Sequence, residues 1–423
     1  MRFTEFKEYK KGKAGQLKGK DAFKKSSKPG GNETPHPARG KLVGESILKE
    51  GARIEHMEDL VFRDLPPSKG ANRALQSLID MEKGAHKDVT VKWDGSPAVI
   101  FGRDEDGEFI FTDKSGFTAK GYDGRSKSAK DLESMLMARP GASNPDPKKR
   151  QDFKAFVARM KDVYDEFEKA TPKDYRGFFK GDMLYFNTPQ IEGDNYVFEP
   201  NIVKYYVSKN SELGKKIARS KTGIVIHREV DAQGNEGPLK NKDIFQGEEV
   251  LVVPPVTASS APKIDDTGVK ELKAVIAKDA SAMDSLLDMN TLTQLKLKKL
   301  PEVFYAYMNS KVDTGLENLG GDFLEWIKNR NQLSEAAKKK IAEYIGSNQQ
   351  GFKAMWEVVA KIQRVKDDVI AQLDKQDIPV KQSMSGDGES VDGGEGYVLA
   401  HPEGDIKLVP RQTFSKFNRA KVR

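Results

Sequence analysis

The order of predicted secondary structure constrains this fold more than any other feature of the sequence. Short alternating or apolar segments typical of strands occupy residues 89–112 and 177–253, whereas residues 267–378 show almost entirely helical periodicity. Two further strand segments, at 396–400 and 405–409, follow a Gly- and Ser-rich joint at 383–394. Because an isolated hairpin is barely stable, we expect these last strands to rejoin the earlier sheet. The sequence therefore predicts an α+β fold of antiparallel sheets with an all-helical insertion.

Composition divides the chain into four parts. Residues 1–40 form a basic tail with eleven Lys and Arg against four acidic residues, a surplus that accounts for the whole net charge of +7. The tail is poor in aliphatic residues, so we expect it to be disordered when free, either as a solubilising leader or as a phosphate-binding arm. Residues 41–255 are the main body, 256–390 the helical insertion with flexible joints, and 391–423 the return to the body.

Several classes of protein and site are disfavoured. The chain has no Cys, which excludes disulfides, thiolate metal sites and a cysteine nucleophile. The longest apolar run, near residues 250–253, is far too short to span a membrane, so we expect no membrane partner. The five His residues lack the spacing of a zinc site, and there is no P-loop motif. Any catalysis must therefore use groups other than thiols.

One short motif points to a specific chemistry. Lys92-Trp93-Asp94-Gly95 lies between two predicted strands, where a turn would present Lys92 to a cleft. The motif reads K-x-D-G and resembles motif I of the covalent nucleotidyltransferases, which comprise ATP-dependent DNA ligases, RNA ligases and mRNA capping enzymes. In that superfamily the lysine is the nucleophile that takes up the nucleotide. The resemblance implies that Lys92 has this role and that Asp94 holds the loop, while an exposed turn lysine is the simpler alternative.

The remaining motifs of the superfamily follow in the same order. Residues 112–116 resemble motif Ia, 178–184 motif III, 394–399 motif IV and 405–408 motif V, while either 196–198 or 205–207 stands for motif IIIa. The residues at the key positions are Lys114, Asp182, Phe198, Glu395 and Lys407. Motif III here has Asp in place of the more common Glu. In motif V the second lysine is replaced by Val409, so that Lys407, helped by Arg411, would meet the phosphates.

The resemblance also implies the cofactors ATP and Mg²⁺. Glu395 would face the metal, Lys407 and Lys114 would neutralise phosphate charge, Asp182 would accept hydrogen bonds from ribose, and Phe198 would stack on adenine. These residue types suit the task, because Mg²⁺ takes carboxylate and phosphate oxygens and transferring phosphoryl groups need fixed cations.

The activity implied is that of an ATP-dependent RNA ligase acting in RNA repair, in which Lys92 forms a lysyl-adenylate and 5′-phosphate ends are sealed to 3′-hydroxyl ends. RNA is expected rather than DNA because only 16 residues follow Lys407, too few for the OB-fold of DNA ligases. Residues 54–60 and 91–98 also resemble uncharacterised proteins of large tailed phages, which implies the host cytoplasm. The alternatives are a DNA ligase or another nucleotidyl transfer, and a non-catalytic phage structural or nucleic-acid-binding protein that keeps the fold.

Overall fold

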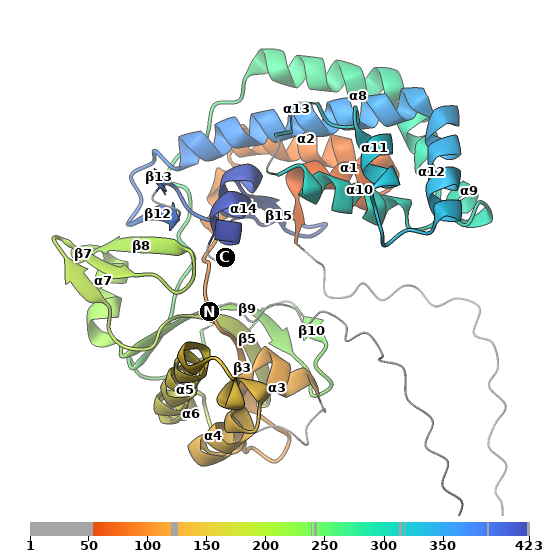
Figure 1. Ribbon diagram of the computed structural model, residues 1–423. Coiled ribbons are helices and arrows are strands. Elements are labelled where there is room, and N and C mark those ends of the chain that lie inside the picture. Colours follow the sequence, from red (N-terminus) through yellow and green to blue (C-terminus); the bar gives the residue numbers. More distant parts are fainter. Residues whose placement is uncertain are drawn as a thin grey trace, which may run out of the picture. The chain divides into compact units, whose positions relative to one another are not determined.

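Three β-sheets organise the protein, and strands that are distant in sequence pair within them (Figure 1). The structure, a computed structural model, describes residues 54–119, 126–237, 239–240, 243–312, 315–316, 318–386 and 389–420. The tail at 1–40 lies outside these residues. The fold is mixed α+β and most strand pairs are antiparallel, as the sequence predicts.

The first sheet joins the two ends of the described chain. Its strand order is β1 (Glu55–His56), β15 (Ile406–Leu408), β14 (Tyr397–Leu399) and β2 (Val89–Val91). Strand β14 is antiparallel to both β15 and β2, while β1 is parallel to β15. The two last strands therefore do pair with the strand that precedes Lys92.

The second sheet has six strands. Five follow the order β10 (Glu236–Gly237), β9 (Thr222–Val230), β5 (Gly177–Tyr185), β3 (Ala98–Arg103) and β4 (Phe109–Asp113), and β11 (Val250–Val252) pairs with β9. Alternate residues of β3 and β4, such as Phe101 and Phe111, pack on the helices α4 (Ala129–Met137), α5 (Pro147–Asp162) and α6 (Tyr164–Ala170). On the opposite face Phe117 of α3 (Lys114–Ala119) covers Ile100, Ile110 and Phe178. This agrees with the helices expected at 126–175.

The third sheet corrects two expectations. Its order is β13 (Glu389–Asp392), β12 (Val380–Gly386), β8 (Val203–Ser208), β7 (Asn195–Phe198) and β6 (Gln190–Glu192), and helix α7 (Glu212–Arg219) contacts β7 and β8. The segment expected to be a flexible joint at 383–394 instead supplies most of β12 and β13. Gly and Ser in β12 did not prevent pairing, because β8 offers a hydrogen-bonded partner from Val380 to Met384. Residues 195–207, expected as one strand region, form the hairpin β7–β8.

The helical segment shares a hydrophobic core with the main body. It contains α8 (Asp266–Leu286), α9 (Met289–Gln294), α10 (Leu300–Ser310), α11 (Phe323–Lys328), α12 (Glu335–Ser347) and α13 (Gln349–Leu373). The helices α8 and α13 lie side by side and both contact α2 (Pro67–Lys83), while α1 (Leu60–Arg63) brings Phe62 to within 5.9 Å of Trp356, measured between ring centroids (Figure 1). The ends of the segment are joined where Lys263 and Gln372 exchange two hydrogen bonds of 2.8 Å.

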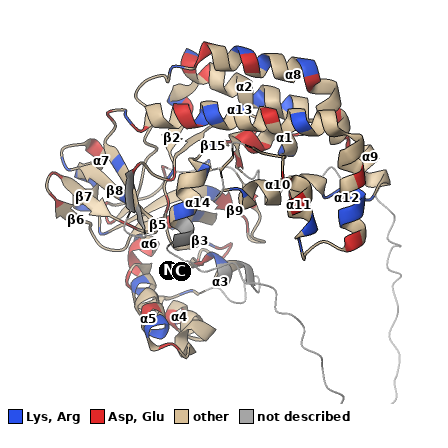
Figure 2. Ribbon diagram, turned by 45° about the horizontal axis from the view of Figure 1, so that its top comes forward, with Lys and Arg blue, Asp and Glu red and all other residues tan. Residues whose placement is uncertain are grey.

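Local signals in the sequence set where these helices begin. The carboxylate of Asp265 accepts hydrogen bonds from the backbone N–H groups of Thr267 and Gly268 at the start of α8, and the hydroxyl of Ser334 accepts one from Ala337 in α12. Such caps satisfy backbone donors that have no partner within the helix. Charged residues of both signs alternate on the outer surfaces of α8 and α12 (Figure 2). The elements η1 (Met57–Asp59), η2 (Ala85–Asp88), η4 (Pro140–Ser143) and α14 (Arg411–Ala420) complete the secondary structure of the described residues.

Candidate active site

Three of the residues singled out by the motifs lie on or within two residues of neighbouring strands of the first sheet. Lys92 directly follows β2, Glu395 precedes β14 by two residues, and Lys407 lies within β15. The register places Val91 opposite Tyr397 and Val398 opposite Lys407. Strand pairing therefore brings the Lys92 turn close to Glu395 and Lys407, although the whole helical segment separates Lys92 from the other two in sequence.

Lys92 and Glu395 are in direct contact in this site. The Nζ atom of Lys92 lies 2.5 Å from Oε1 of Glu395, and the side chains are 21% and 13% exposed. The backbone N–H of Lys92 also donates a 2.9 Å hydrogen bond to the carbonyl of Gly396. Burial raises the pKa of Glu395, an effect that Lys92 and Lys407 oppose and Asp94 reinforces. Burial and these neighbouring charges act on Glu395 in opposite directions, and the net effect is a raised pKa.

Gly396 is required by the geometry of this contact. Its φ of +103° lies in the region that disfavours residues with a Cβ, and a Cβ would stand 2.1 Å from the carbonyl oxygen of Leu408. The glycine of the Glu-Gly pair therefore lets β14 approach β15 directly after Glu395.

Asp94 holds the turn that carries Lys92. Its carboxylate is buried and accepts hydrogen bonds from the side-chain amide of Asn201, at 3.0 Å, and from the backbone N–H of Ile202, at 3.2 Å. Its own backbone N–H donates to the hydroxyl of Tyr205. These bonds join the Lys92 turn to the segment between β7 and β8, in agreement with the loop-holding role that the resemblance implies.

Asp182 reaches the same turn from the second sheet. Gly95 packs so closely on β5 that a Cβ there would lie 2.6 Å from the Cβ of Asp182. Two backbone hydrogen bonds fix this approach, from Ser96 to Met183 at 2.8 Å and from Met183 to Pro97 at 3.0 Å. The candidate motif III acid thus lies beside the candidate motif I turn.

Lys114 lies at the same end of the second sheet. It is the exposed first residue of α3, directly after β4, where Asp113 is paired with Val99. Because Ala98 is also opposite Asp182, the start of α3 and the Lys92 turn lie at the same end of neighbouring strands.

Phe198 occupies a different position from the one expected of a base-stacking residue. Its side chain is 8% exposed, and its ring packs against Trp93, Tyr205 and Tyr185 at centroid distances of 6.2, 5.4 and 5.3 Å. Tyr205 is also fully buried. Both candidates for motif IIIa thus contribute to the core beneath the Lys92 turn. Stacking of Phe198 on adenine stays a prediction, and it would require these rings to separate.

A protein-family model matches most of this chain. The family of unknown function DUF6267 matches residues 52–124 and 148–422. The chain belongs to this family. Its matched ranges contain all seven residues singled out by the motifs. No curated protein and no solved structure matches the chain.

A buried ionic cluster, which the sequence analysis missed, lies behind β15 in this member of DUF6267. Glu58 contacts Lys366 at 2.8 Å and Arg411 at 3.0 Å, and Asp59 makes a bidentate pair with Arg411 at 2.6 and 2.9 Å. All four side chains are at most 2% exposed. Burial alone would raise the pKa of Glu58, but Lys366 and Arg411 lower it to about 2.

The cluster corrects the role expected for Arg411. Because its guanidinium group is buried against Glu58 and Asp59, Arg411 does not supplement Lys407 at a phosphate site in this structure. A signal was available in the sequence, since Lys366 interrupts the apolar face of α13 between Ile362 and Ile370. A charge at a core position of an amphipathic helix requires a buried partner.

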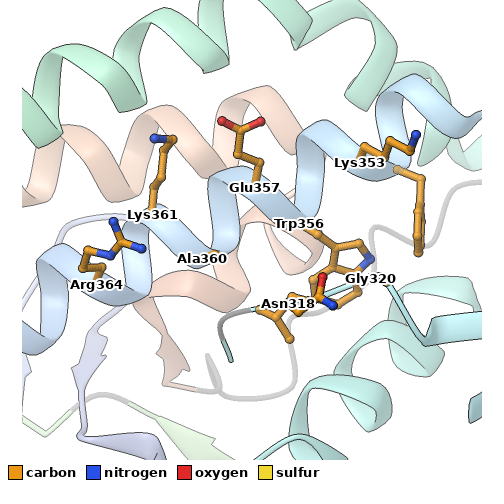
Figure 3. Close-up of a pocket in the computed structure, with 11 residues that line it drawn as sticks. Asn318, Gly320, Lys353, Trp356, Glu357, Ala360, Lys361 and Arg364 are labelled. Carbon is orange, nitrogen blue, oxygen red and sulfur yellow. The ribbon is translucent and has the colours of Figure 1, made fainter. Parts of the chain in front are cut away.

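A separate cavity lies along α13, away from these motifs. It has a volume of about 540 Å³ and is bordered by Trp356, Lys353, Arg364 and the turn at 318–321 (Figure 3). None of the seven motif residues lines it. Lys361, which also borders it, is paired with Glu271 at 2.8 Å.

The residues that the structure describes contain neither a membrane-spanning helix nor a ready-made metal site. In that part of the chain no helix has the length and apolar character needed to cross a bilayer. It also contains no group of three or more His, Cys, Asp or Glu side chains arranged to hold a metal ion. A metal at Glu395 would therefore depend on substrate oxygens as additional ligands.

Proposed function

We propose that this protein is an ATP-dependent nucleotidyltransferase of the RNA ligase type, with Lys92 as its nucleophile. The observation that supports this best is the 2.5 Å contact between Lys92 and Glu395 on paired strands, with Lys407 on the next strand. Asp182, which packs against Gly95, adds a second acid from another sheet. Four motif residues that could have been scattered by chance are thus gathered around one turn.

The first chemical step is the adenylation of Lys92. A lysine attacks phosphorus only as the neutral amine, so Lys92 must first give up a proton, and Glu395 is the base within reach. The lysine nitrogen then forms a bond to the α-phosphorus of ATP while the bond from that phosphorus to the bridging oxygen breaks. Pyrophosphate leaves with the electron pair, and AMP stays on Lys92 as a phosphoramidate.

The residues present fit a magnesium ion only in part. Glu395 supplies one hard oxygen ligand, and ATP phosphates and water would have to supply the others. When bound, the ion would neutralise phosphate charge. Lys407, which is close enough to oppose the raised pKa of Glu395, and Lys114 at the start of α3 supply positive charge from the protein itself.

The second and third steps define the proposed ligase activity. The AMP is transferred from Lys92 to the 5′-phosphate of a polynucleotide, forming a 5′–5′ phosphoanhydride and freeing the lysine amine. A 3′-hydroxyl then attacks the 5′-phosphorus, a phosphodiester forms, and AMP leaves. RNA as the polynucleotide is part of the proposal, and sealing of nicked RNA in competition with nicked duplex DNA tests it. Sealing of nicked DNA alone would replace RNA ligase by DNA ligase.

The decisive experiment asks whether Lys92 becomes labelled. Full-length protein is incubated with α-labelled ATP and Mg²⁺, and protein-bound label that resists alkali and is released by acidic hydroxylamine, as expected of a phosphoramidate, is measured on a denaturing gel. We expect Lys92→Ala to abolish the label and Lys87→Ala, at an exposed lysine nearby in η2, to retain it. A folded wild type that takes no label from ATP or GTP would exclude adenylation.

A second candidate function is favoured by a specific observation at motif V. Val409 replaces the second lysine and is 3% exposed, while Arg411 is held in the buried ionic cluster. Only Lys407 of this segment then serves the phosphates. A protein that binds nucleic acid or builds a phage structure without turnover would tolerate this loss, and the labelling experiment separates the two functions.

A further inference from the structure

His227 and Asp182 form a half-exposed pair next to the candidate nucleotide site. The Nε2 atom of His227 lies 3.0 Å from Oδ2 of Asp182, and the two side chains are 37% and 27% exposed. His227 comes from β9 and Asp182 from the neighbouring strand β5. The pair is accessible enough for a ligand to reach it, in contrast to the buried Asp94.

A β-bulge accounts for the position of His227. In the register of β5 and β9, Lys180 is opposite Arg228 and Gly181 is opposite Ile226. No residue of β5 is therefore paired with His227. Bulges of this kind redirect a side chain and occur often beside functional sites. The bulge lets His227 approach Asp182, whose direct cross-strand neighbour is Val225.

Only one oxygen of Asp182 is engaged. Oδ2 contacts His227, whereas Oδ1 accepts no hydrogen bond from the residues that the structure describes. Asp94 differs, since Asn201 and Ile202 occupy both of its oxygens. Because Gly95 packs against Asp182, Oδ1 is an acceptor beside the Lys92 turn that no described residue occupies. A carboxylate oxygen at this position can accept a hydrogen bond from a hydroxyl group of a ligand.

We propose that His227 is a positioning residue that makes the site select ribonucleotides over 2′-deoxyribonucleotides. Its Nε2–H donates to Oδ2 and fixes the carboxylate, so that Oδ1 accepts a hydrogen bond from a ribose hydroxyl. The inference rests on the proposed function, because it takes the Lys92 turn as the nucleotide site. The motifs imply only that Asp182 accepts a hydrogen bond from ribose, and the new element is His227, a residue outside the motifs that fixes this carboxylate.

The test measures binding without chemistry. The dissociation constants of the α,β-methylene analogues of ATP and 2′-deoxy-ATP, whose methylene bridge blocks adenylation, are compared by equilibrium dialysis with full-length protein and Mg²⁺. We expect the wild type to prefer the ribose form about tenfold, the effect of one hydrogen bond to a charged group. His227→Phe should reduce the preference to about one, while His227→Gln, which keeps a donor, should preserve most of it.

Two further variants make the result specific. His401→Phe, at a half-buried histidine in the turn between β14 and β15, is the matched control and should keep the wild-type preference. Asp182→Asn should lose the preference, and adding His227→Phe to it should change nothing more. If His227→Phe does not fold, as thermal unfolding would reveal, Asp182→Asn together with His227→Gln decides the question.

The outcomes separate this inference from the proposed function. A wild type that binds both analogues equally, or a folded His227→Phe protein with an unchanged preference, overturns the selectivity. If Lys92 nevertheless becomes labelled with ATP, the proposed function stands without it. Failure of the wild type both to bind the analogues and to take up label overturns both.

Discussion

The amine of Lys92 lies 2.5 Å from a carboxylate oxygen of Glu395, and this contact depends on the pairing of β2 with β14. In the sequence, β2 precedes the helical segment and β14 follows it. Because Val91 is opposite Tyr397, Lys92 and Glu395 extend from the same end of the strand pair. The contact is thus a property of the assembled sheet rather than of a local motif.

Replacement of Glu395 by Gln should reduce the labelling of Lys92 by at least about a hundredfold, because the variant loses both the proton acceptor and the proposed metal ligand. The fold should persist, since Gln has the same shape. Single-turnover labelling with α-labelled ATP measures the effect. The control is Glu403→Gln, at an exposed carboxylate in the turn after β14, which should label at the wild-type rate. Equal labelling rates for Glu395→Gln and Glu403→Gln would contradict a role of Glu395 in the labelling reaction.

The same carboxylate predicts how labelling depends on pH. Burial raises the pKa of Glu395 above 4.5, so the group becomes protonated at a higher pH than an exposed glutamate. Labelling needs the ionised form and should therefore decrease as the pH falls, beginning above the usual titration range of glutamate. Wild-type labelling rates between pH 4.5 and 8, at constant ionic strength, provide the measurement. A rate independent of pH over this interval would argue against Glu395 as the base.

Gly396→Ala should destabilise the protein by about 2 kcal/mol, because the new Cβ would overlap the carbonyl oxygen of Leu408 and the backbone φ is unfavourable for alanine. Displacement of β14 should also move Glu395 away from Lys92 and reduce labelling. Urea unfolding gives the stability change. Gly346→Ala, at an exposed position of α12 with open space around it, should instead stabilise the protein by about 0.5–1 kcal/mol. Equal effects at the two glycines would contradict the close approach of β14 and β15.

Lys366→Met should destabilise the protein by about 3 kcal/mol, since it leaves the buried ionic cluster with one negative charge in excess. Adding Glu58→Gln restores neutrality and should recover part of this loss. The matched control is Lys361→Met, five residues earlier on α13, which removes a surface ion pair and should cost less than about 1 kcal/mol. Unfolding in urea compares the three proteins, and similar losses at Lys366 and Lys361 would contradict the importance of the cluster.

We expect His56 to contribute to the pH dependence of the protein's stability. Burial and the nearby Arg411 lower the pKa of His56 well below 6.5, so the native state excludes a proton that the unfolded state binds. Stability should therefore fall as the pH decreases below 6.5, by up to about 1.4 kcal/mol per pH unit from this residue. His56→Gln removes that contribution. Urea unfolding of both proteins from pH 8 to 5 should show a steeper decline for the wild type, and parallel curves would contradict the prediction.

The sequence predicted the strands and helices well where the periodicity was strong. The segments around β3, β4, β5 and β9 and the helical region after residue 266 appear as expected, because each has a clear apolar pattern. The Gly- and Ser-rich residues of β12 and β13 were expected to form a joint. Their pairing depends on a partner, β8, that lies far away in sequence. Local composition does not encode that partner.

The motifs predicted individual residues of the candidate site but not the contacts between them. Lys92, Asp182, Glu395 and Lys407 were chosen for their motifs, and the structure brings their strands and turns together. The approach of His227 to Asp182 was not foreseen, because it depends on a bulge that shifts the register by one residue. The burial of Arg411 was also missed, since it depends on tertiary contacts with Glu58 and Asp59.

Deletion of residues 1–40 should weaken RNA binding and leave the labelling of Lys92 unchanged. This segment carries a surplus of seven positive charges, and lysines that contact phosphates release counterions, so binding becomes steeply dependent on salt. The deletion should flatten the slope of log Kd against log salt concentration, whereas adenylation requires only ATP and the folded body. Fluorescence anisotropy with a labelled single-stranded RNA at several salt concentrations measures the slope. A variant in which the Lys and Arg residues of the tail are replaced by Gln at constant length provides the control for charge. If both variants keep the wild-type affinity and slope, the tail has no role in binding nucleic acid and acts as a solubilising leader.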